Sequence, residues 1–211
     1  MSTYGTTSRD HIQRSLSCLD EGTYATILYA ALEVRLATEA RLSEYLWAWS
    51  HISEKTKDGW SISKLFKGTM TEFSRMEKYM IFSISTKESN TLTFLYTPVT
   101  NETKSAGERL SGFLHSRGIA NIDGDEGWEK LVSDIRSAQQ MIIDSNTGTM
   151  LGPALLKNNK ISMSVELIEE TDGDLIKKTY MKGRETESSV NYYETLSDAL
   201  NENPIIWKIR H

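Results

Sequence analysis

The chain has 211 residues, 38% of them hydrophobic and 25% charged, and a formal net charge of -5. This composition excludes a disordered chain, and the absence of a basic block counts against strong non-specific nucleic-acid binding while leaving room for a local basic cleft. Cys18 is the only cysteine, which excludes an internal disulfide and a cysteine zinc ribbon, and no apolar run reaches about 18 residues. We therefore expect a cytoplasmic protein without a membrane span, a metal or a cofactor.

The N-terminal part predicts two helices that form an antiparallel pair. Ser8 is a suitable N-cap for the first helix, and Gly22 ends it. Thr23 then caps a long helix over residues 24–52, which contains neither Gly nor Pro. Its apolar residues point in nearly all directions, so we expect other helices to enclose it.

The long helix also carries four charged residues, Glu33, Arg35, Glu39 and Arg41. Charges that face a core need an opposite charge or a hydrogen bond, and Arg35 and Glu39 are spaced to pair with each other. Two interpretations remain open. These residues form an internal ion-pair network or reach solvent along a narrow seam, or they line a functional groove.

The middle of the chain predicts further helices and one hairpin. Apolar residues at helical spacing predict a helix from Ser61 to about Tyr79. β-branched and aromatic residues on both sides of a Ser-Asn pair predict a β-hairpin at about residues 79–97. Helices are expected over residues 101–117 and 125–144, the first ending at Gly118.

Beyond residue 148 the pattern changes to that of strands. Residues 161–167 alternate between apolar and polar, and the Asp172-Gly173 turn predicts a hairpin. After a polar loop over residues 183–189 we expect a short segment around Tyr192, a helical turn at 196–200 and a last strand at 205–209.

These elements predict an α+β protein with two domains. The first, residues 8–147, is an antiparallel helical bundle with the hairpin inserted in it. The second, residues 148–211, is small and rich in β structure.

Arg109 and His115 are the residues best suited to chemistry. Imidazole is an acid or base near neutral pH, and guanidinium can hold a phosphate with paired donors. They are six positions apart in the sequence, which is about 9 Å along a straight helix and about 120° around it, so a curved helix end or a second subunit has to bring them together. His115 shares a face with Ser111 and Glu108. The plain alternative is that His115 forms a hydrogen bond within the bundle or caps the helix end.

Two stretches, ALEVRLATEARLSEYL and the later ERLSGFLH, resemble the HEPN superfamily of helical-bundle proteins over roughly residues 8–144. The residues that carry the resemblance are Ala31, Leu32, Glu33, Arg35, Glu39, Leu110, Gly112, Leu114 and His115. Many HEPN members are metal-independent endoribonucleases with an Arg, four to six intervening residues and a His, and Arg109 and His115 match that spacing.

The resemblance implies cleavage of RNA phosphodiesters, in a bacterial defence or toxin-antitoxin setting. His115 would act as the general acid or base and Arg109 would stabilise the charged phosphorane, while Glu33, Arg35, Glu39 and Ser111 would support them. HEPN ribonucleases generally place this motif at a twofold interface, so a homodimer is implied.

The alternative function is a non-catalytic interaction module that binds a protein partner or small ligand, with the C-terminal region available for a protein partner. The acidic balance of the chain and the apolar Leu110 after the arginine favour it. Nucleotide binding within the bundle is a weaker third idea, because the sequence has no glycine-rich phosphate loop.

Overall fold

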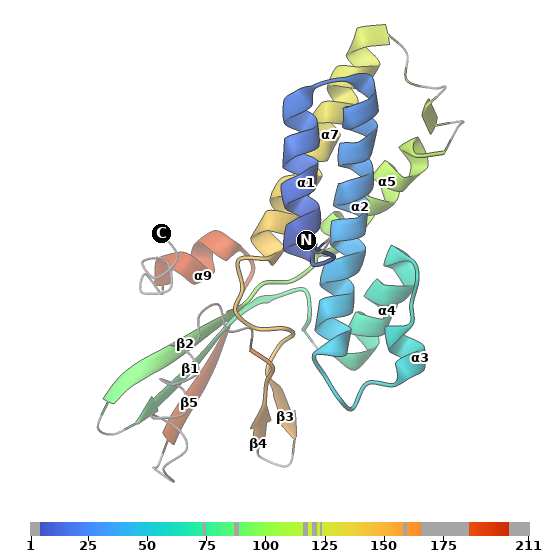
Figure 1. The fold of residues 1–211 in the computed structure, drawn as a ribbon. Helices are drawn as coiled ribbons and strands as arrows, with labels where there is room; N and C mark the ends of the chain where they lie inside the picture. Colours follow the sequence, from blue (N-terminus) through green and yellow to red (C-terminus); the bar gives the residue numbers. More distant parts are fainter. Residues whose placement is uncertain are drawn as a thin grey trace. The chain divides into compact units, whose positions relative to one another are not determined.

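The computed structural model is a mixed α and β protein, shown in Figure 1. It describes residues 5–73, 75–86, 89–115, 118–119, 122, 124–157, 160–165 and 186–202. The chain divides into two units, a helical one made of residues 1–72 with 99–146 and a second one made of residues 73–98 with 147–211. None of the helices in the described ranges is long and apolar enough to cross a bilayer.

The helical unit contains the predicted helices with shifted ends. They are α1 (Ser8–Glu21), α2 (Tyr24–Trp47), α4 (Ile62–Glu72), α5 (Asn101–Phe113) and α7 (Gly124–Ser145). A further short helix, α3 (Glu54–Lys57), was not predicted. Thr7, and not Ser8, caps α1: its side chain accepts from the N–H of Asp10, whose carboxylate accepts from the N–H of Thr7. Gly22 ends α1 with a φ of 67°, and Thr23 caps α2 as predicted.

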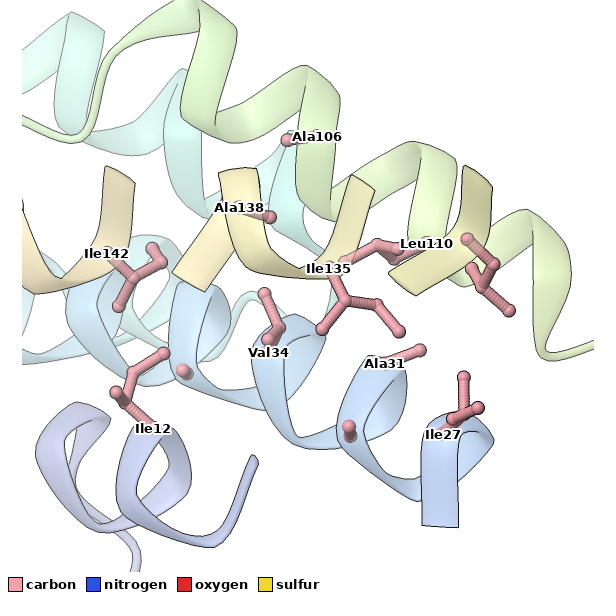
Figure 2. Packing of buried hydrophobic residues seen from close by; sticks show 12 residues of the cluster. Ile12, Ile27, Ala31, Val34, Ala106, Leu110, Ile135, Ala138 and Ile142 are labelled. Atoms are coloured by element: carbon pink, nitrogen blue, oxygen red, sulfur yellow. The ribbon is translucent and has the colours of Figure 1, made fainter. Parts of the chain in front are cut away.

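The long helix α2 lies at the centre of the helical unit, as its apolar pattern predicted. It packs against α1, α3, α4, α5 and α7. Figure 2 shows side chains of α2 meeting those of α1, α5 and α7 in one core. The buried members of this core are Ile12, Ile27, Ala30, Ala31, Val34, Ala37, Ala106, Leu110, Leu131, Ile135, Ala138 and Ile142. Helix α2 is not fully enclosed, because its residues Tyr24, Tyr29 and Trp47 are exposed.

Three predicted helices end earlier than expected. The long helix predicted to reach residue 52 ends at Trp47. The helix predicted to reach Tyr79 ends at Glu72, and Arg75 beyond it has a left-handed φ of 57°, which a continuing helix does not allow. The helix predicted to reach Arg117 ends at Phe113, where the N–H of Leu114 bonds to the carbonyl of Ser111 three residues back.

The second unit holds a three-stranded antiparallel sheet with strand order β2-β1-β5. Strands β1 (Tyr79–Thr86) and β2 (Ser89–Tyr96) confirm the predicted hairpin, and β5 (Thr186–Tyr193) pairs with the other edge of β1. Helix α9 (Leu196–Glu202) packs its Ala199 against Ile81 and Leu95 of the sheet. Strands β3 (Leu155–Lys157) and β4 (Lys160–Ser162) form a separate small hairpin.

The hairpin thus groups with C-terminal residues and not with the helices, in contrast to its predicted place within residues 8–147. The reason is that β1 has two edges, and its second edge pairs with β5 along its full length. Most of the predicted polar loop at 183–189 is part of β5, from Thr186 onward. The strand predicted for 161–167 is shorter, since β4 ends at Ser162. The Asp172-Gly173 turn and the strand at 205–209 lie outside the described residues.

Candidate functional site

Glu33 on α2 faces α1 and is paired there. Its Oε2 atom lies 2.7 Å from Nδ1 of His11 and accepts a 3.1 Å hydrogen bond from Nε of Arg14. Burial raises the pKa of Glu33, but the hydrogen bonds from Arg14 and His11 outweigh burial and hold the pKa below its ordinary value. Glu33 is therefore a charged link between α1 and α2.

Arg35 and Glu39 line a groove between α2, the start of α4 and α5, which we call the α2–α5 groove. Its lining residues are Arg35, Glu39, Ser61, Ile62, Ser63, Glu108 and Ser111, and its volume is about 200 Å³. Arg35 donates to Glu39 at 3.1 Å, as the spacing predicted. Glu108 accepts hydrogen bonds from Ser63 and, at 3.1 Å, from Lys104. Burial raises the pKa of Glu108, but these two bonds outweigh it and lower the pKa.

Arg41 is only 1% exposed and joins three helix ends. Its Nε and Nη2 donate to the carbonyl of Ser145 at 3.1 and 2.8 Å, and its Nη1 donates to Glu44 at 2.9 Å. The other carboxylate oxygen of Glu44 accepts the backbone N–H of Ser8 at 2.8 Å. A cation thus meets the C-terminal end of α7 and an anion meets the N-terminal end of α1, which is the arrangement that helix dipoles favour.

Arg109, in the C-terminal half of α5, and His115, beyond its end, are both exposed. Arg109 lines an open hollow of about 300 Å³ together with Asn101, Glu102, Ser105 and Met141. His115 lies two residues beyond the end of α5, and its carbonyl accepts the N–H groups of Gly118 and Ile119 at 2.8 and 3.1 Å. Neither side chain forms a hydrogen bond or ion pair with any residue that the structure describes.

Arg109, Gly112 and His115 follow one another at three-residue spacing and are all exposed, and we call them the α5 strip. The bond from Leu114 to Ser111 gives the last turn of α5 a 3₁₀ character. This bond closes at Leu114, and His115 follows it directly, outside the helix. A Cβ atom at Gly112 would meet no described atom within 4 Å.

The predicted site residues thus fall into three places. Arg35, Glu39 and Ser111 share the α2–α5 groove, whereas Glu33 pairs with α1. Arg109 and His115 belong to the α5 strip, and neither lines that groove.

No family model, curated protein or solved structure matches the chain. Function therefore has to be inferred from the chemistry of its side chains. Across the residues described above, no group of three or more His, Cys, Asp or Glu side chains is placed to hold a metal ion.

Sequence reasoning missed the residues that complete these clusters. His11 and Arg14 hold Glu33, and Ser63 and Lys104 hold Glu108. A signal existed for three of them. His11 and Arg14 are three residues apart on one face of an amphipathic helix next to the α2 carboxylates, and Lys104 is four residues before Glu108. The partnership of Ser63 with Glu108 links distant parts of the chain, so spacing alone does not predict it.

Proposed function

We propose that the protein is a HEPN-like endoribonuclease that cleaves RNA phosphodiesters without a metal ion, with the α5 strip as its reactive surface. The observation that carries this proposal is that Arg109 and His115 are both exposed, with Gly112 midway between them in the sequence, where a Cβ atom would meet no described atom within 4 Å. A phosphate over Gly112 would meet no side chain at that position. Arginine and histidine would flank it.

The proposed reaction is attack of a ribose 2'-oxygen on the neighbouring phosphorus with departure of the 5'-oxygen. His115 accepts the 2'-hydroxyl proton as general base, or donates a proton to the departing oxygen as general acid. The guanidinium of Arg109 stabilises the negative charge of the phosphorane with paired N–H donors. The products are a 2',3'-cyclic phosphate and a free 5'-hydroxyl.

A homodimer completes this proposal, since one histidine cannot serve as base and acid in the same step. Two copies of the α5 strip across a twofold axis provide two histidines and two arginines for one phosphate. Such an assembly keeps the basic surface local, which reconciles RNA cleavage with a chain of net charge -5.

Light scattering should then give twice the 23.9 kDa mass of the chain. A monomer at micromolar concentration would contradict the two-copy site.

Cleavage of single-stranded RNA in EDTA by wild type and His115→Ala is the direct test. Loss of the general acid or base should slow cleavage about 100-fold to 10,000-fold. Thermal unfolding should not change, because His115 is exposed and makes no described side-chain bond. His51→Ala is the matched control, since His51 is also exposed in the helical unit.

Arg109→Lys separates the charge of Arg109 from its donor geometry, and Arg136→Ala is the control. Lysine keeps the charge of Arg109 but loses the paired donors, so cleavage should fall, whereas loss of the exposed Arg136 on α7 should leave it intact. If wild type leaves RNA intact, or if His115→Ala cleaves equally well, the nuclease proposal is wrong.

The second candidate is a non-catalytic interaction module, and one observation favours it. A catalytic imidazole is commonly oriented by a hydrogen bond to its second nitrogen, and no described residue orients His115 in this chain. In that case the α5 strip binds a partner and cleaves no RNA. His115→Ala would then weaken the complex with that partner.

A further inference from the structure

The outer face of α4 and Trp60, two residues before the helix, form an exposed aromatic and basic surface. Trp60 is 74% exposed, and Nζ of Lys64 lies 4.8 Å from the centroid of its ring. Lys67 follows on the same face and is also exposed. Between Trp60 and Thr71 the sequence has no acidic residue, although the whole chain has a net charge of -5. We call Trp60, Lys64 and Lys67 the α4 surface.

Local packing keeps Trp60 in solvent. A Cβ atom at Gly59 would lie 3.0 Å from Cδ2 of Leu65, so the glycine lets the chain pass tightly over that buried leucine. The inner face of α4 is then occupied by Ile62, Leu65, Phe66 and Thr69. The helical repeat leaves Lys64 and Lys67 together on the opposite face, and the Trp60 ring lies beside Lys64.

The chemistry of the α4 surface matches single-stranded nucleic acid. An indole offers a planar face on which any base can stack, and adjacent lysines attract the phosphates. Lys64 lies over one face of the Trp60 ring, and the high exposure of Trp60 leaves the other face of the ring accessible. A duplex keeps its bases stacked inside and cannot use such a platform. We propose that the α4 surface binds a single strand by stacking a base on Trp60.

This surface lies on the helix next to the α5 strip. Helices α4 and α5 pack together, and Ser63 in the first turn of α4 donates a hydrogen bond to Glu108, the residue before Arg109. The identification of the strand as RNA rests on the proposed function. Binding itself does not, because stacking and phosphate attraction require no cleavage.

A single strand of 2'-O-methyl RNA tests binding separately from cleavage. It keeps the bases and phosphates but has no free 2'-hydroxyl, so the proposed reaction cannot consume it. We expect fluorescence anisotropy to show binding by wild type at low salt, and much weaker binding of the matching duplex. Trp60→Ala should raise Kd about 5- to 150-fold, whereas Trp60→Phe should keep most of the affinity. Lys64→Ala should reduce the slope of log Kd against log salt by about 0.7.

Two control variants remove the same chemical groups elsewhere in the helical unit. Tyr29→Ala removes an aromatic side chain that is 60% exposed, and Lys130→Ala removes an exposed lysine on α7. Both should leave Kd unchanged.

The results separate the two proposals. Binding of the methylated strand without cleavage of RNA would keep the α4 surface and end the nuclease proposal. No binding at low salt, equal binding of duplex, or an unchanged Kd in Trp60→Ala would overturn the α4 surface. Displacement of the strand by polyglutamate at matched charge would also overturn it, by showing that the surface selects negative charge and not bases.

Discussion

Arg41 and Arg109 show two opposite uses of arginine within one helical unit. Arg41 is buried, and its donors are directed to the Ser145 carbonyl and to Glu44. Arg109 is exposed beside an open hollow and bonds to none of the described residues. Burying a cation has a cost that only fixed partners offset, so Arg41 is committed to the fold. Arg109 keeps its donors available for a ligand.

The difference teaches where function should be sought in this chain. The charged residues of the central helix suggested a functional groove because they lie in an apolar sequence. The structure shows that two of them, Glu33 and Arg41, hold helices together. The α5 strip lies on the surface, where a charged residue is ordinary in sequence terms. Whether a charged side chain has a hydrogen-bond or ion-pair partner therefore distinguishes structural charges from those free to bind a ligand. An apolar sequence around the charge does not make this distinction.

The largest effect on stability is expected from Arg41→Ala. The change leaves Glu44 and the end of α7 without their buried cation, and breaking such a pair costs about 3–5 kcal/mol in the free energy of unfolding. Arg109→Ala should change it by less than about 0.5 kcal/mol, as is usual at the surface. Urea unfolding of both variants measures the difference.

Arg41→Met distinguishes the lost hydrogen bonds from lost volume. Methionine retains much of the apolar length of the side chain but none of its donors, so its loss of stability should approach that of Arg41→Ala. Equal stability of Arg41→Ala and Arg109→Ala would show that the buried partners are not important for folding.

A smaller effect is expected in the apolar part of α2. Leu46 is fully buried and Leu32 is half-buried. Leu46→Ala should cost about 2–5 kcal/mol and Leu32→Ala about 1 kcal/mol, because the lost transfer energy and the residual cavity both scale with burial. Similar losses for the two variants, measured by urea unfolding, would mean that α2 is enclosed on the side of Leu32 as well.

Local patterns predicted most of the helical unit. The cap at Thr23, the stop at Gly22 and the central place of α2 follow from short-range chemistry and from periodicity. The grouping of the hairpin was not predictable in this way. Pairing of β1 with β5 joins residues about a hundred positions apart, and the polar sequence of β5 hides the strand.

The candidate site was only partly accessible from sequence. Spacing correctly paired Arg35 with Glu39, since one helix carries both. It also suggested that Arg109 and His115 lie about 120° apart. The early end of α5 changes that relation, and it depends on the tertiary setting of Leu114, which no local signal announces.

The smallest expected effect concerns the pH dependence of stability and tests whether Glu33 is a structural charge like Arg41. The pKa of Glu33 is lowered in the folded protein, so its carboxylate contributes stability that is fully present above the unfolded-state pKa. That contribution is lost as the pH falls through the folded pKa. Glu33→Gln should therefore cost about 1–2 kcal/mol at pH 7, where Arg14 and His11 lose their anionic partner, and much less in acid. Thermal unfolding of wild type and variant from pH 7 to about pH 3 measures this convergence, with Glu129→Gln on the exposed face of α7 as the control. A constant difference between wild type and Glu33→Gln over the whole range would mean that packing, and not the charge of Glu33, stabilises the contact between α1 and α2.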